Sequence, residues 1–205
     1  MNTRVKICGI TNVADGQAAA EAGADLIGLM FYEPSPRYVS LAAAAAIARA
    51  LPPEVQRVGV FVNPTTELVR RAIGECQLSL LQFHGDEPPD FCTQFGLMSL
   101  KAFRIRDAAS LDALPNYATD AYLLDAYSPE ARGGTGEKFN WDLAVEAQKF
   151  GRPIFLAGGL TPANVAAAVK QVQPFAVDVS SGVESAPGKK DPVKVRAFIQ
   201  AARGA

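Results

Sequence analysis

The chain has 205 residues, which is enough for one domain with a substantial hydrophobic core. Its 20 basic and 21 acidic side chains give a formal net charge of -1, so the composition shows no electrostatic footprint for nucleic acid. No apolar run approaches the roughly 20 residues that a membrane helix requires, and we expect no membrane partner. A small anionic ligand needs only a local positive patch and stays compatible with this composition.

Potential soft metal ligands are few and widely spaced. The three cysteines, Cys8, Cys76 and Cys92, and the single histidine, His84, match neither a zinc spacing nor a disulfide framework. The first residues lead directly into a strand pattern without a secretory leader. We therefore expect a reduced cytoplasmic protein with no metal site.

Strand-like and helix-like segments alternate along the chain. Short apolar runs predict eight strands, at 4–8, 25–31, 57–62, 78–83, 98–103 and 121–125 and within 153–162 and 175–184. Capping residues or helix-forming runs predict a helix after each strand, beginning at Thr11 or Asn12, Ser40, 63–65, 88–89, Ala108, Asn140, 161–162 and 191–192. Alternation of this kind is typical of parallel βα units. Eight units predict a single (β/α)8 TIM barrel domain over residues 1–205, in preference to an open doubly wound sheet.

One connection is much longer than the others. It runs from Ala126 to Phe139 and contains the glycine-rich segment 133–138. This segment lacks the serine or threonine that follows the lysine of a Walker motif. We interpret it as a lid over the mouth of the barrel.

Small residues follow the last two predicted strands. Gly158 and Gly159 follow the seventh, and Ser181 and Gly182 follow the eighth. Glycine lets a backbone approach a ligand closely, and free N–H groups beside a helix start attract an anion. A (β/α)8 barrel commonly holds phosphate after these two strands. The four residues therefore predict a phosphate-binding site.

Reactive side chains in this fold lie at the carboxyl ends of strands, a position held here by Cys8, Gln82, His84, Asp125 and Asp178. Lys6 should share a strand face with Cys8, and its ammonium would lower the thiol pKa from about 8.5. Asp125 closes an apolar run, where a carboxylate is either paired or kept for proton transfer. The position of Asp125 favours neither interpretation over the other.

The remaining candidates also have structural interpretations. Asp178 interrupts the last strand, and a salt bridge to Lys6 or Arg4 is as compatible with that position as a ligand contact. An isolated histidine such as His84 more often has a structural role than a catalytic one. Arg37, in the loop after the second strand, would by default be solvated.

Together these segments resemble the phosphoribosylanthranilate isomerase family, essentially from end to end. The resemblance rests on the joint order and spacing of 6–11, 31 with 35–39, 82–85, 124–125, 133–136 with 139–141, 156–160 and 177–184. Thr135 stands where serine would be equally expected, and both residues offer a hydroxyl group.

The resemblance implies an Amadori rearrangement in tryptophan biosynthesis, without a metal or organic cofactor. N-(5′-phosphoribosyl)anthranilate would become 1-(2-carboxyphenylamino)-1-deoxyribulose 5-phosphate. Asp125 would act as the general acid that opens the sugar ring, and Cys8 as the base that removes a proton from the adjacent sugar carbon. The partner would be this small phosphorylated substrate, and the subunit would be a monomer or a homodimer.

The resemblance also implies roles in binding. The backbone at Gly158–Gly159 and Ser181–Gly182 would hold the phosphate, and Arg37 would pair with the anthranilate carboxylate through its planar guanidinium. Asp178 would contact the amine or a sugar hydroxyl, and His84 would support the site.

Two other functions remain open at this point. A pentose-phosphate epimerase would need several metal ligands, and a relative of indole-glycerol-phosphate synthase would need a strand-end glutamate and a catalytic lysine, for which Lys6 and Lys101 are candidates. A barrel that only binds a phosphorylated ligand would have the same glycine turns. It would have no need for both a thiol and a carboxyl group at strand ends.

Overall fold

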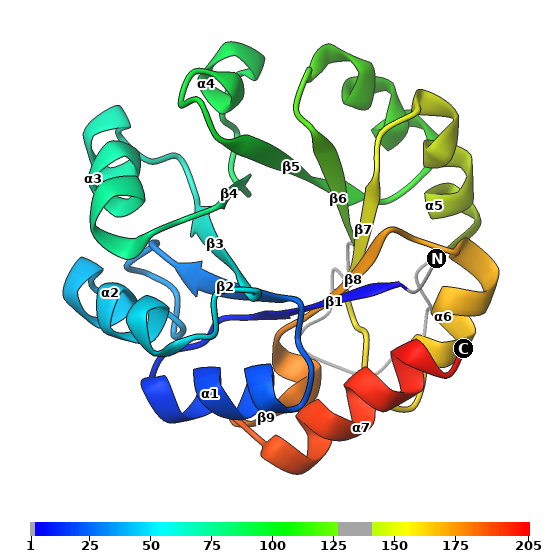
Figure 1. The fold of residues 1–205 in the computed structure, drawn as a ribbon. Coiled ribbons are helices and arrows are strands. Elements are labelled where there is room, and N and C mark those ends of the chain that lie inside the picture. Colours follow the sequence, from blue (N-terminus) through cyan, green and yellow to red (C-terminus); the bar gives the residue numbers. More distant parts are fainter. Residues whose placement is uncertain (1–2, 127–140) are drawn as a thin grey trace.

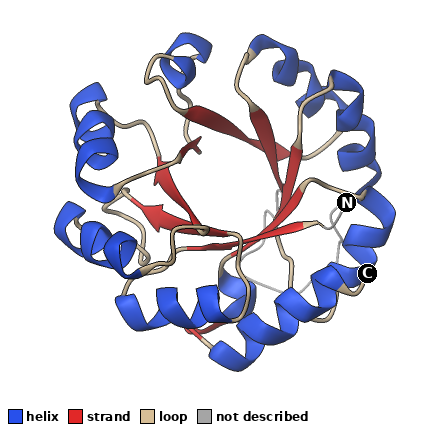
Figure 2. Ribbon diagram, viewed as in Figure 1, coloured by secondary structure: helices blue, strands red, loops and turns tan. Residues whose placement is uncertain are grey.

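The computed structural model describes residues 3–126 and 141–205. Its parallel strands close into a barrel in the order β1 to β8, and helices surround the barrel (Figures 1 and 2). The predicted (β/α)8 architecture is confirmed. No helix in these two ranges is long and apolar enough to cross a membrane.

The barrel strands follow the predicted order closely. They are β1 (Arg4–Cys8), β2 (Leu26–Met30), β3 (Gln56–Phe61), β4 (Leu80–Phe83), β5 (Met98–Ile105), β6 (Ala121–Ala126), β7 (Ile154–Ala157) and β8 (Ala176–Val179). Pairing of β1 with β8 closes the ring, in a register that sets Lys6 beside Asp178.

The main helices are α1 (Val13–Glu21), α2 (Leu41–Ala50), α3 (Thr66–Cys76), α4 (Pro89–Thr93), α5 (Trp141–Ala147), α6 (Val165–Val172) and α7 (Pro192–Arg203). Three short 3₁₀ helices are η1 (Ala108–Asn116), η2 (Gln148–Phe150) and η3 (Ser181–Val183). The side chains of Asn12, Ser40, Thr65 and Asp191 accept backbone N–H bonds at helix starts, as the sequence predicts. Asn140 and the glycine-rich segment 133–138 lie outside the described residues.

The prediction that Thr161 and Pro162 begin a helix is wrong. Helix α6 begins at Val165, and a turn precedes it in which the Asn164 carboxamide accepts the Thr161 N–H at 2.7 Å. The same carboxamide donates to the Gly159 carbonyl at 3.0 Å. Within this turn the Asn164 and Val165 N–H groups donate to the Thr161 carbonyl.

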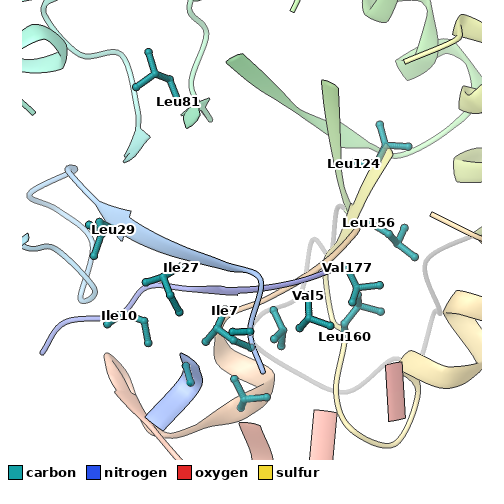
Figure 3. Close-up of a cluster of buried hydrophobic side chains, with 14 of the residues drawn as sticks. Val5, Ile7, Ile10, Ile27, Leu29, Leu81, Leu124, Leu156, Leu160 and Val177 are labelled. Carbon is teal, nitrogen blue, oxygen red and sulfur yellow. The ribbon is translucent and has the colours of Figure 1, made fainter. Parts of the chain in front are cut away.

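Side chains on each strand alternate between the barrel interior and the layer of helices. The interior cluster contains Cys8, Leu26, Val58, Val60, Leu80, Leu100, Ala102, Ala121, Leu123, Phe155, Ala157 and Ala176. The larger cluster lies between strands and helices and includes Val5, Ile7, Leu29, Leu124 and Leu156 (Figure 3). Only the last inward side chain of each strand can therefore reach the mouth of the barrel.

A small antiparallel hairpin, which the sequence pattern did not predict, follows the last barrel strand. It pairs β9 (Glu184–Ala186) with β10 (Lys189–Lys190), and its register places Lys190 opposite Glu184. The hairpin connects η3 to α7 (Figure 1).

Two glycines offer a matched test of packing around the barrel. A Cβ on Gly59 in β3 would lie 2.5 Å from Leu78 Cδ1 and 2.8 Å from Phe61 Cε2, whereas a Cβ on Gly74 in α3 would meet nothing within 4 Å. We expect Gly59→Ala to lower the free energy of unfolding by about 1–3 kcal/mol through overpacking. Gly74→Ala should raise it by about 0.5–1 kcal/mol, because alanine favours a helix interior. Denaturant unfolding measures both, and equal changes would contradict the tight packing at Gly59.

Candidate active site

A cavity of about 260 Å³ opens at the carboxyl ends of the barrel strands. The residues that the resemblance assigns to the site all line it, namely Cys8, Arg37, His84, Asp125, Gly158, Gly159, Asp178, Ser181 and Gly182. Strands β1 and β6 are separated by β7 and β8 around the ring, so the thiol and the Asp125 carboxyl group approach the cavity from different sides. A small molecule in the cavity can contact both groups.

Cys8 lies above a buried ion pair. Lys6 Nζ is 2.9 Å from Asp178 Oδ1, and the Lys6 side chain is fully buried. Gly28 on β2 leaves the space that the thiol needs, because a Cβ there would lie 2.8 Å from Cys8 Sγ and 3.2 Å from Lys6 Nζ. Asp178 both pairs with Lys6 and lines the cavity, so its two interpretations from the sequence are compatible.

The predicted lowering of the Cys8 pKa is wrong. Burial raises the pKa of the thiol, and this effect outweighs the lowering by the Lys6 ammonium. The Asp178 carboxylate raises the Cys8 pKa further and neutralises Lys6 at short range. The surroundings of Cys8 therefore favour a protonated thiol.

A hydrogen-bonded chain leads to the Asp125 carboxyl group. Gln82 Nε2 lies 2.9 Å from His84 Nδ1, and His84 Nε2 lies 3.3 Å from Asp125 Oδ2. If the Gln82 amide donates to Nδ1, the imidazole proton resides on Nε2 and is donated to Asp125. His84 thus orients Asp125, whose side chain keeps 33% of its surface exposed.

Two buried polar atoms in the described part of the chain have no hydrogen-bond partner, Gln82 Oε1 and Ser180 Oγ. Both residues line the cavity. Both atoms can therefore form a hydrogen bond to a molecule in the cavity. The strand-end position had identified Gln82 without a role, and nothing in the sequence had identified Ser180.

Arg37 is not the solvated arginine that its loop position alone would suggest. Its side chain is 23% exposed, and its Nε and Nη2 donate to the two Glu184 carboxylate oxygens at 2.8 and 2.7 Å. These bonds raise the pKa of Arg37, although burial opposes them. Lys190 Nζ approaches Glu184 Oε1 at 2.7 Å. No separate signal in the sequence marks Glu184 or Lys190, because their contact with Arg37 requires the hairpin.

The two glycine turns after β7 and β8 lie together at the cavity. Gly158 and Gly159 have positive φ angles of 84° and 64°, which glycine adopts without strain. Gly182 lies against the Leu160 carbonyl oxygen so closely that a side chain there would clash. The N–H groups of Gly159, Ser181 and Gly182 donate no hydrogen bond to another residue of the described ranges. They are therefore free to bind an anion.

Lys101, a candidate for a synthase-like reaction, lies outside the cavity. It alternates with the inward-facing Leu100 and Ala102, and its Nζ contacts the Gly85 carbonyl at 2.6 Å and Glu87 Oε2 at 2.9 Å. Its ammonium fixes the loop after β4 instead of facing a ligand. Within residues 3–126 and 141–205, no group of three or more His, Cys, Asp or Glu side chains could hold a metal ion.

Comparison with known proteins gives a consistent result. A family model described as N-(5′-phosphoribosyl)anthranilate (PRA) isomerase matches residues 5–201. The N-(5′-phosphoribosyl)anthranilate isomerase of Geobacter sulfurreducens is 55% identical over 201 residues, covering 98% of each chain. The crystal structure of the Thermotoga maritima phosphoribosyl anthranilate isomerase superposes with a TM-score of 0.93 at 43% identity, covering 99% of this chain and 100% of that one.

A second solved structure contains a ligand. It is a phosphoribosyl anthranilate isomerase in complex with reduced 1-(o-carboxyphenylamino)-1-deoxyribulose 5-phosphate. It has a TM-score of 0.90 and 40% identity, covering 99% of this chain and 100% of that chain.

The environment of Cys8 predicts how its reactivity depends on pH. Because the thiol pKa is raised, the thiolate forms only at high pH, and the rate of alkylation by iodoacetamide should have a midpoint above about pH 8.5. Asp178→Asn should move that midpoint to lower pH, since it removes a negative charge beside the thiol and leaves Lys6 unpaired. Mass spectrometry of the Cys8 peptide measures the rate.

The other two thiols provide the background for this measurement. Burial raises the pKa of Cys76 to about 11 and that of Cys92 to about 12, so both should react slowly. Alkylation of the Cys8→Ser variant measures the combined rate of Cys76 and Cys92. A midpoint below pH 8.5 in the unmodified protein would show that Lys6 dominates burial.

Proposed function

The chain belongs to the N-(5′-phosphoribosyl)anthranilate isomerase family, and on that premise we propose that it isomerises N-(5′-phosphoribosyl)anthranilate to 1-(2-carboxyphenylamino)-1-deoxyribulose 5-phosphate in tryptophan biosynthesis. The main support is the position of Cys8 and Asp125 in one cavity beside two glycine turns with free N–H groups. Acid–base chemistry at adjacent sugar carbons needs two such groups on different sides of one small molecule.

Asp125 acts first in this proposal, as the general acid. It gives a proton to the ring oxygen while the aryl nitrogen lone pair expels that oxygen, which opens the furanose to an iminium ion. The His84 hydrogen bond holds the carboxyl group toward the cavity.

Cys8 then acts as the base. Its thiolate removes the proton from the sugar carbon next to the iminium, which gives an enolamine that tautomerises to the ketone. The iminium is positive and favours the thiolate electrostatically, so the raised pKa of the thiol is compatible with this role. Before this step the thiol releases its own proton to solvent. Asp125 then gives up one proton and Cys8 takes one. The tautomerisation adds a proton to the carbon of the former iminium and removes one from the enol hydroxyl, which restores both groups, so no co-reactant is consumed.

Two anchors hold the ends of the substrate in the proposed complex. The free N–H groups at Gly159, Ser181 and Gly182 bind the phosphate, since grouped backbone N–H donors form an anion site. At the other end, the guanidinium of Arg37 binds the anthranilate carboxylate. Asp178 contacts the amine or a sugar hydroxyl.

We propose further that residues 1–205 form one domain and that the protein acts in the cytoplasm as a monomer or a homodimer. The barrel strands extend from residue 4 to residue 179, and α7 continues to Arg203. The thiols of Cys8, Cys76 and Cys92 are all free, as is usual in a reducing compartment.

Removal of either proton-transfer group tests the reaction. Cys8→Ser and Asp125→Asn should each lower kcat by about 10²- to 10⁴-fold, the usual contribution of a general acid or base. Product affinity should change little, since neither variant removes an anchor. A fluorescence assay that follows loss of freshly made phosphoribosylanthranilate measures kcat.

The control is Asp112→Asn, which changes an exposed carboxylate on η1 and should leave kcat unaltered. Near-normal turnover in Cys8→Ser or Asp125→Asn would defeat the role given to that residue.

Arg37→Ala tests the aryl anchor. Loss of a charged, bidentate contact should weaken product binding by about tenfold or more. Binding of inorganic phosphate should stay close to that of the unmodified protein. Isothermal titration with both ligands measures the contrast, and an equal loss for both would assign Arg37 to the phosphate or to the fold.

A further inference from the structure

Glu184 binds one edge of the Arg37 guanidinium and leaves the other edge free. A guanidinium has five N–H donors, and the two bonds to Glu184 use one on Nε and one on Nη2. Nη1 donates to no residue in the described ranges, so a second fork, formed by Nη1 and the remaining Nη2 hydrogen, is unoccupied. Arg37 lines the cavity and Glu184 does not, which places the free fork nearer the ligand.

Lys190 changes the charge of this group. Arg37 and Glu184 alone would be neutral and would attract an anion weakly. The Lys190 ammonium, at 2.7 Å from Glu184 Oε1, gives the three groups a net positive charge. Burial raises the pKa of Glu184, but hydrogen bonds from Arg37 and Lys190 outweigh it and lower that pKa below the ordinary value. Burial lowers the pKa of Lys190, and its hydrogen bond to Glu184 opposes that effect. Glu184 is therefore ionised at neutral pH.

The β9–β10 hairpin, which carries Glu184 and Lys190, is bonded to neighbouring parts of the chain. Lys190 N–H donates to Asp15 Oδ2 at 2.9 Å, and Thr11 Oγ1 donates to the Gly188 carbonyl at 2.6 Å. Gly188 has a φ of 77°, and a Cβ on it would lie 2.9 Å from the Pro36 carbonyl oxygen, next to Arg37. The hairpin thus reaches both α1 and the loop that carries Arg37.

The same hairpin touches the phosphate turn. Lys190 Nζ donates to the Ser180 carbonyl at 3.2 Å, immediately before Ser181 and Gly182. One ammonium group therefore contacts both the residue that orients Arg37 and the backbone that leads into the proposed phosphate site.

We propose that Glu184, supported by Lys190, is a positioning residue that fixes the free fork of Arg37 for the aromatic carboxylate and so selects substrates that carry this group. This inference rests on the proposed function, in which Arg37 binds the anthranilate carboxylate. A planar guanidinium recognises a carboxylate only in a narrow range of orientations, and a bidentate partner on its far edge removes that freedom before the ligand arrives.

Two ligands that differ only in the carboxylate test the proposal. One is reduced 1-(o-carboxyphenylamino)-1-deoxyribulose 5-phosphate, and the other is the same compound with a phenyl group in place of the carboxyphenyl group. Glu184→Gln should weaken binding of the first ligand by about tenfold or more. It should leave binding of the second close to that of the unmodified protein. In steady state, KM should rise more than kcat falls.

A double-mutant cycle distinguishes a role of Glu184 in positioning Arg37 from a role in stabilising the fold. If Glu184 acts through Arg37, Glu184→Gln should not weaken the carboxylated ligand further in the Arg37→Ala background. Glu184→Asp retains the negative charge that pairs with Arg37 and Lys190, so it should disturb the fold less. It should weaken binding of the carboxylated ligand by a smaller factor and leave binding of the other ligand unchanged. Lys194→Met is the matched control, because Lys194 Nζ donates to the Glu184 backbone carbonyl at 2.9 Å and not to its carboxylate.

Each outcome has a distinct meaning. Equal weakening of both ligands by Glu184→Gln and by Glu184→Asp would overturn the proposal and assign Glu184 to the fold or to the phosphate turn. A further loss in the Arg37→Ala background would also overturn it. If Arg37→Ala itself weakens both ligands equally, the error lies in the proposed function of Arg37.

Discussion

The barrel can close as it does because Lys6 and Asp178 neutralise each other inside it. Both side chains point into the interior from paired positions on β1 and β8, and their charged atoms are 2.9 Å apart. An isolated charge at either position would be very unfavourable, whereas the pair satisfies both groups. The pair also lies directly beneath Cys8. The Lys6–Asp178 ion pair therefore stabilises the pairing of β1 with β8 and also sets the electrostatic environment of Cys8, the proposed base.

Two further ion-pair groups hold the loops at the mouth of the barrel. Glu87 accepts bonds from the Gly85 and Asn63 N–H groups and pairs with Lys101, which fixes the loop that carries His84. Glu184 holds Arg37 on the loop after β2. In both cases a buried carboxylate, supported by a lysine, stabilises a loop from outside the cavity. The cavity walls thus keep their donors and acceptors for a ligand.

The raised pKa of Cys8 fits a base that is needed only after the sugar ring opens. Burial outweighs the effect of the Lys6 ammonium and keeps the thiol protonated. Under the proposed mechanism, a positive iminium forms beside the thiol and replaces part of the solvation that burial removed. The positive charge of the bound iminium, and not that of Lys6, would then favour the thiolate when Cys8 removes the proton from the sugar carbon.

The sequence by itself determined the eight βα units, most of the helix caps and most of the polar residues that line the cavity. These features depend on near neighbours and on strand periodicity, which can be read along the chain. The start of α6 was mispredicted because the Asn164 side chain, three residues beyond Thr161, organises that turn. Only the tertiary structure decided the charge around Cys8 and the partner of Arg37. Asp178 is 172 residues from Lys6 and Glu184 is 147 residues from Arg37, so both contacts exist only once the barrel has closed.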